Sequence, residues 1–205
     1  NWEGAVLQHG ETDGVRYRLP TWLNDGERLV AVTDAGGEES FVVLRADASG
    51  EPERLSGILP IVAEHGCPVI ALAMDDKKIP ETGEQRFEVI TKIIKETRAL
   101  GIPDSNLYFD PLAMTISTNT QSAMIAFETM RCVREQYPEA HLTIGLSNIS
   151  FGLPGRSFVN RYFLSLAMQN GLDSAILDPL DKEIQAAIMT SELILGRDKH
   201  CLNFI

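Results

Sequence analysis

The stretch that decides the fold runs from Leu142 to Arg156 and reads LTIGLSNISFGLPGR. It opens with a short apolar run, 142–146, of the kind that a buried strand shows. The run stops at Ser147-Asn148, and a Gly- and Pro-rich turn then leads into SFVNRYFLSLAMQNG, whose apolar spacing predicts a helix. Asn148 is therefore expected at the carboxyl end of a strand, where parallel-sheet enzymes keep their polar site groups. The open alternative is that Asn148 only caps a turn, which Asn does well.

The same alternation of strand and helix extends over the chain from Glu51 onward. Apolar spacing predicts helices at 51–66, 84–101, 121–137, 157–171 and 182–196, and strands at 67–74, 106–112, 141–148 and 173–180. The helix at 121–137 is expected to present Met124, Phe127 and Val133 inward. Strands that are apolar on both faces and alternate with helices predict parallel βα units. Because the sequence has no Gly-rich phosphate loop, we expect an α/β fold of the (β/α) barrel type rather than a nucleotide-binding open sheet.

Residues 1–50 differ from the rest in composition and are rich in Gly, Asp, Glu and Thr. They contain β-like runs at 15–22, 27–34 and 40–47, separated by turn residues, which predict a meander of short strands. We therefore expect an N-terminal segment, 1–50, and a barrel portion, 51–205. The chain opens with Asn rather than Met, as expected of a processed or truncated piece.

The net charge of −11 argues against nucleic acid and against an anionic membrane surface as partners, since both require clustered Lys and Arg. No apolar stretch is long enough to span a bilayer, and no signal peptide opens the chain. The three cysteines are far apart and set among apolar residues, which is typical of reduced thiols in a cytoplasmic protein. The four histidines lack metal-ligand spacing, so no metal site is expected.

Polar residues follow each predicted strand, and the carboxyl ends of parallel strands meet at one rim. These groups are Met74-Asp75-Asp76, Asp110-Pro111, Ser147-Asn148 and Asp178-Pro179, with Arg156 in the loop after the third. Taken singly, an Asp-Pro after a strand is typical of a turn, and an Arg in a loop is typically solvated. Together, carboxylates and a carboxamide suit a planar heterocycle with amide and amine edges. No Ser/His/Asp or Cys/His nucleophile arrangement is evident.

These residues resemble the pterin-binding methyltransferases. The resemblance covers about Glu51 to Ile205 and is carried by YFDPL at 108–112, GLSNISFGLPGR at 145–156, VNRYFL at 159–164 and GLDSAILDPLD at 171–181. It implies a (β/α)8 barrel that transfers a methyl group from methyltetrahydrofolate to the cobalt of a corrinoid (cobalamin) carried by a partner protein. The same domain occurs in cobalamin-dependent methionine synthase, and dihydropteroate synthase is a more distant relative.

The resemblance also implies roles for three residues. Asp110 is similar to the aspartate that hydrogen-bonds the pterin ring, and Arg156 to an arginine that shapes the pterin pocket. Asn148 is similar to the asparagine that contacts the methyl-bearing ring nitrogen, which makes it the candidate catalytic residue. A carboxamide fixed at that nitrogen would bind the transition state better than the ground state.

The sequence departs from the family before Glu51. Ala46 stands where the family has an Asn of the pterin clamp, and residues 1–45 do not match the family's first βα units. The first units are therefore expected to be missing or replaced, and the exposed sheet edge that results favours a homodimer. Three functions stay open: the methyltransferase, a pterin-binding protein without turnover, and dihydropteroate synthase. The last is disfavoured because its Lys after the GLSN-equivalent strand and its Arg-x-His are absent.

Overall fold

The computed structural model of the chain describes residues 52–74 and 79–204, together with five short strands before residue 52; side chains are described at 58–74 and 79–204. The helices are α1 (Pro52–His65), α2 (Gly83–Ala99), α3 (Ser122–Gln136), α4 (Arg156–Gln169) and α5 (Lys182–Ile194), and the short 3-10 helices are η1 (Asp104–Asn106), η2 (Leu146–Ser150) and η3 (Lys199–Cys201). All five helices predicted from the sequence are therefore confirmed.

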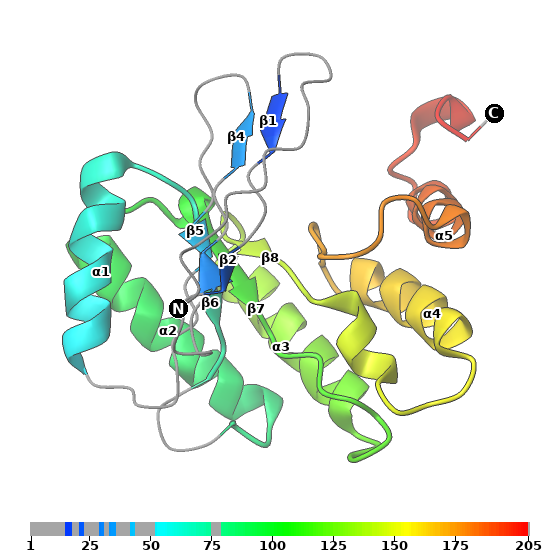
Figure 1. The fold of residues 1–205 in the computed structure, drawn as a ribbon, viewed down its shortest axis with the longest axis horizontal. Helices are drawn as coiled ribbons and strands as arrows, with labels where there is room; N and C mark the ends of the chain where they lie inside the picture. Colours follow the sequence, from blue (N-terminus) through cyan, green and yellow to red (C-terminus); the bar gives the residue numbers. More distant parts are fainter. Residues whose placement is uncertain are drawn as a thin grey trace.

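A parallel sheet forms the centre of the molecule. It contains, in this order, β5 (Val42–Val43), β6 (Val69–Leu72), β7 (Leu107–Asp110) and β8 (His141–Leu142). Each strand pairs with the next in parallel, with Leu72 opposite Asp110 and Phe109 opposite Leu142. Figure 1 shows α1, α2 and α3 following the sheet from β5 towards β8, with α4 and α5 beyond β8. The predicted α/β fold with parallel βα units is confirmed.

The last two predicted strands are shorter than expected. Only His141–Leu142 of the predicted strand at 141–148 belongs to β8, and the predicted strand at 173–180 is reduced to one parallel bridge between Gly145 and Ile176. The two segments still run side by side, since Ile176 donates its N–H to the carbonyl of Ile144 at 2.8 Å. In this edge segment Pro179 has no N–H to donate to a ladder, and the Asp178 side chain closes a turn on Leu180.

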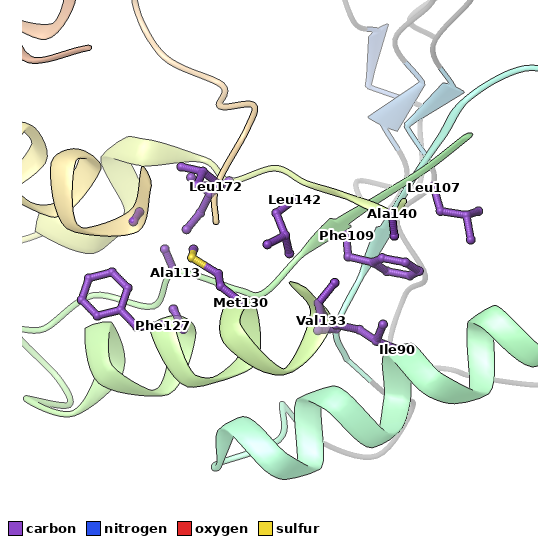
Figure 2. Close-up of a cluster of buried hydrophobic side chains, with 14 of the residues drawn as sticks. Ile90, Leu107, Phe109, Ala113, Phe127, Met130, Val133, Ala140, Leu142 and Leu172 are labelled. Carbon is purple, nitrogen blue, oxygen red and sulfur yellow. The ribbon is translucent and has the colours of Figure 1, made fainter. Parts of the chain in front are cut away.

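The core lies between the sheet and the helices α2 and α3. Phe109 and Leu142 project from the sheet towards Met130 and Val133 of α3, and all four side chains are fully buried (Figure 2). The expectation for Met124 was wrong, because its side chain is 54% exposed. At 3.6 residues per turn, Met124 lies about half a turn from Ala126, which is at the centre of the buried face of α3.

The strands before residue 40 form two antiparallel pairs and not the predicted meander, since the first strand pairs with the fourth. β1 (Val15–Tyr17) pairs with β4 (Thr33–Ala35), and β2 (Thr21–Trp22) pairs with β3 (Leu29–Val30). β5, from the predicted run at 40–47, instead joins the parallel sheet beside β6. The boundary at residue 50 stays a prediction.

Candidate functional site

The candidate site lies where β7 and β8 end. Asp110 is the last residue of β7, and the loops that follow β7 and β8 are hydrogen-bonded to each other. Ile116 donates its N–H to the carbonyl of Ile149 at 3.1 Å, while the Thr115 and Ser117 hydroxyls donate to the carbonyl of Phe151 at 2.6 and 3.0 Å. These bonds hold the loop after Asp110 against the loop that carries Asn148, so both residues belong to the same end of the sheet.

Asp110 is a partly buried carboxylate that organises its own turn. Its Oδ1 accepts the N–H of Leu112 at 2.8 Å, and Leu112 has a φ of 63°, a left-handed conformation that is rare for a branched side chain. Burial raises the pKa of Asp110 to about 6, although the Leu112 hydrogen bond and the positive charge of Arg86 both act to lower it. The group is therefore ionised at neutral pH and gains protons just below it.

Arg86 is a residue of this site that the sequence analysis missed. It lies in the first turn of α2, its side chain is only 3% exposed, and it donates hydrogen bonds to the loops on both sides of it. Its Nε donates to the carbonyl of Pro80 at 3.1 Å, and its Nη1 donates to the carbonyls of Pro111 and Leu112, both at 2.7 Å. A signal was present in the sequence: Arg86 precedes Val89, Ile90 and Ile93 by three, four and seven residues, and so shares the buried face of the helix.

Asn148 does not end a strand but lies inside η2, so the expected strand-end position was wrong by a few residues. The apolar run continues as a 3-10 turn, in which Asn148 donates its N–H to the carbonyl of Gly145 at 3.2 Å. The Asn148 side chain is exposed, and among the described residues no hydrogen bond to its carboxamide is found. Its Nδ2 lies 3.1 Å from the position that a Cβ on residue 145 would take, so Gly145 leaves room for the carboxamide.

Arg156 is the first residue of α4 and folds back over the turn that holds Asn148. Its Nη2 donates to the carbonyl of Ser147 at 2.8 Å, and its Nε donates to the hydroxyl of Ser150 at 3.0 Å. The guanidinium also lies 5.9 Å from the centre of the Phe151 ring, within range of a cation–π contact. Arg156 thus stabilises the conformation of η2.

The remaining rim residues make a smaller contribution or cannot be placed. Asp178 is exposed and accepts the N–H of Leu180 at 2.9 Å, as a turn residue does. Asp75 and Asp76, like Ala46, lie outside the described residues. In the described part of the chain, no group of three His, Cys, Asp or Glu side chains could hold a metal ion, and no helix has the length and apolarity needed to cross a membrane.

The elements around the site define an α/β fold built from parallel βα units. Among solved structures, a Yersinia pestis dihydropteroate synthase bound to a pterine–sulfa conjugate superposes with a TM-score of 0.57 at 20% identity, covering 78% of this chain and 62% of that chain. A second structure of the Yersinia pestis enzyme, with a sulfonamide drug, gives a TM-score of 0.53 at 19% identity over 69% of this chain and 56% of that one.

The particular family follows from the sequence. The family described as pterin binding enzymes matches residues 35–178, and the chain belongs to this family. It is 34% identical over 158 residues to the methylcorrinoid:tetrahydrofolate methyltransferase of Eubacterium limosum, which covers 76% of this chain and 58% of that protein. It is 36% identical over 138 residues to the methionine synthase of Mycobacterium tuberculosis, covering 64% of this chain and 12% of that protein. The chain thus spans little more than half of the first relative and a small part of the second.

Proposed function

We propose that this chain binds the pterin ring of a reduced folate at the rim formed by Asp110 and Asn148, and takes part in methyl transfer between methyltetrahydrofolate and a corrinoid. The observation that carries the proposal is the pair of hydrogen-bonded loops after β7 and β8. Their contact supports a shared site for Asp110, a partly buried acceptor, and Asn148, whose carboxamide has no hydrogen bond to the described residues. The names of the two relatives, a methylcorrinoid:tetrahydrofolate methyltransferase and a methionine synthase, support the choice of substrate class.

Asp110 is assigned to ring recognition. A pterin presents adjacent N–H groups along one edge, and an ionised carboxylate accepts two such donors at once. Because the pKa of Asp110 is raised only to about 6, the carboxylate is an anion at neutral pH and can accept both hydrogen bonds. Its Oδ1 already accepts one N–H from Leu112, which fixes its orientation before the ring arrives.

Asn148 is assigned to the methyl-bearing ring nitrogen. When the methyl group leaves for the reduced cobalt, which supplies the electron pair of the new bond, the ring nitrogen keeps the pair of the broken bond and gains a proton. A carboxamide fixed beside this nitrogen would form a hydrogen bond with it. This bond would be strongest in the transition state, where the charge on the nitrogen is changing. The same contact serves the reverse transfer, which is the direction in the name of the Eubacterium limosum relative.

Arg156 is assigned to the pocket wall rather than to the reacting atoms. Its two donors bond the carbonyl of Ser147 and the hydroxyl of Ser150, on either side of Asn148. The turn that carries Asn148 is thereby held by the start of the next helix, so little backbone freedom would be lost when the ring binds.

The second candidate is pterin binding without turnover. It is favoured by Ala46, which stands where the family has an Asn of the pterin clamp. In both proposals residues 51–205 supply βα units of a barrel, and β5 adds a parallel strand before them.

The test is equilibrium binding of methyltetrahydrofolate by calorimetry, followed by single-turnover transfer to free cob(I)alamin. The methyltransferase proposal expects saturable binding together with methylcobalamin formation faster than in the protein-free mixture. Binding with transfer at the protein-free rate would instead support the non-catalytic pterin-binding protein. Absence of binding would contradict both proposals.

A further inference from the structure

The buried guanidinium of Arg86 links two backbone segments near Asp110, one before α2 and one after β7. Among the described residues it donates three hydrogen bonds, all to main-chain carbonyls: one to Pro80 before α2, and two to Pro111 and Leu112 after β7. A buried guanidinium is costly unless it is paired, so this arrangement is a specific feature of the fold rather than a solvated surface charge. It fixes the turn that Asp110 begins.

The turn itself needs support. Leu112 has a φ of 63°, a left-handed conformation that is strained for a non-glycine residue. In this conformation its N–H points to Asp110 Oδ1 at 2.8 Å while its carbonyl accepts from Arg86 at 2.7 Å. Arg86 and Asp110 therefore hold the same strained residue from its two ends, and removing either would release it.

Arg86 also acts on Asp110 through its charge. Burial raises the pKa of Asp110, and the positive charge of Arg86 opposes this; in the same way, burial lowers the pKa of Arg86 while Asp110 raises it. On the β6 side, the Asp110 carbonyl accepts the N–H of Ala73, and on the β8 side the Phe109 carbonyl accepts the N–H of Thr143; neither Ala73 nor Thr143 is charged. The charged residues at 75–78, Asp75, Asp76, Lys77 and Lys78, lie outside the described residues.

We propose that Arg86 is a positioning residue of the pterin site, which fixes the turn from Asp110 to Leu112 and keeps the Asp110 carboxylate an anion directed at the ring. The proposal rests on the proposed function, because a fixed anion matters there only if Asp110 accepts the N–H groups of a pterin. Arg86 does not touch the ring; it acts through Asp110.

The test uses Arg86→Gln, which removes the charge, and Arg86→Lys, which keeps the charge but loses the planar fork. Arg98→Gln is the matched control, since Arg98 lies on the same helix but pairs with Asp104 at the surface with a side chain that is 56% exposed. Two readouts are needed: titration of the Asp110 carboxyl carbon by NMR in the unliganded protein, and the dissociation constant of tetrahydropterin between pH 5 and 8.

Arg86→Gln is expected to raise the pKa of Asp110 and to weaken pterin binding at pH 7 by roughly tenfold or more, with binding partly recovered at pH 8. Arg86→Lys is expected to leave the pKa of Asp110 near that of the parent but still to weaken pterin binding, since a lysine ammonium cannot reproduce the planar arrangement of donors in the guanidinium. Arg98→Gln should change neither readout. If Arg86 had only a structural role, its substitution would lower the melting temperature but would change neither the Asp110 titration nor the pterin dissociation constant.

An unchanged Asp110 titration in Arg86→Gln together with parent-like pterin binding in Arg86→Lys would overturn the proposal. If Arg86→Gln fails to fold, the binding result for Arg86→Lys decides. If the parent binds no pterin, the proposed function fails, while the titration in the unliganded protein still reports whether Arg86 holds Asp110 ionised.

Discussion

The guanidinium of Arg156 donates from Nη2 to the carbonyl oxygen of Ser147 at 2.8 Å, one residue before Asn148. The first residue of α4 thus bonds back to the turn that precedes the helix. The position of the Asn148 carboxamide therefore depends on a side chain from the next element of the chain, because η2 has only five residues and little stability of its own.

Replacing Arg156 by Lys should disturb this turn while keeping its charge. A lysine cannot reach both the Ser147 carbonyl and the Ser150 hydroxyl in the geometry of the guanidinium fork, so Asn148 would become mobile. We expect methyl transfer to fall by roughly tenfold, because small misplacements of a positioned group are costly, and the pterin dissociation constant to change less. Single-turnover kinetics beside equilibrium binding would measure both effects. Arg161→Lys is the control and should leave both values unchanged, because Arg161 lies on the same helix as Arg156 but pairs with Glu183 of α5.

The raised pKa of Asp110 should appear in the pH dependence of stability. Its pKa is about 6 in the folded protein against an ordinary value of 3.8, so between these values the folded state binds more protons than the unfolded state. Stability from this group is therefore complete below about pH 4 and is lost as the pH rises through 6, up to about 3 kcal/mol. Asp110→Asn, which keeps an acceptor for Leu112, should be stabilised relative to the parent at pH 7 but not at pH 4. Urea unfolding at the two pH values measures this, and a constant difference between the proteins would contradict it.

Two methionines on α3 provide a matched test of the core. Met130 is fully buried, whereas Met124 on the opposite face is 54% exposed. Met130→Ala should lower the free energy of unfolding by about 2–5 kcal/mol, since it removes buried methylenes and leaves a cavity. Met124→Ala should change it by less than about 0.5 kcal/mol. Chemical denaturation of both variants checks the pair, and equal losses would mean that the orientation of α3 is wrong.

The outer face of α4 and α5 predicts association between copies of the chain. Tyr162, Leu166 and Ile194 are 71, 48 and 77% exposed and line one groove between the two helices. Exposed apolar surface of this kind favours burial against a second copy. We expect the chain to sediment as a concentration-dependent dimer, and Leu166→Lys with Ile194→Lys to shift it to the monomer. Leu180→Lys, at an exposed apolar residue outside the groove, is the control; a monomeric parent at all concentrations would count against the prediction.

The sequence predicted the elements well and their ends poorly. Apolar periodicity is a property of single segments, so it located α2 and the strand that ends at Asp110 without knowledge of the tertiary structure. The length of β8 depends on which backbone lies beside it, and that is not encoded in the run 142–146 itself. The prediction that Met124 points inward was wrong for a similar reason, because an apolar residue on an exposed face cannot be distinguished by sequence from one in the core.

The candidate site could be predicted in part. Asp110 and Asn148 were expected at one rim from their positions after apolar runs, and the two loops that carry them are hydrogen-bonded together. Arg86 could not be connected to the turn at Asp110, since its hydrogen bond to Leu112 joins residues 26 positions apart and is accepted by a backbone carbonyl that has no sequence signature.

The most direct test of the central claim is the effect of Asn148→Ala on the two steps of the reaction. Because the carboxamide is exposed and bonded to no described residue, its removal should cost little stability and should change pterin binding only slightly. Loss of its contact with the ring nitrogen should lower single-turnover methyl transfer by about 10²–10³-fold. A large loss of transfer with near-parent binding is the result that we predict. Transfer at the parent rate would mean that Asn148 is only a turn residue, and would contradict the account.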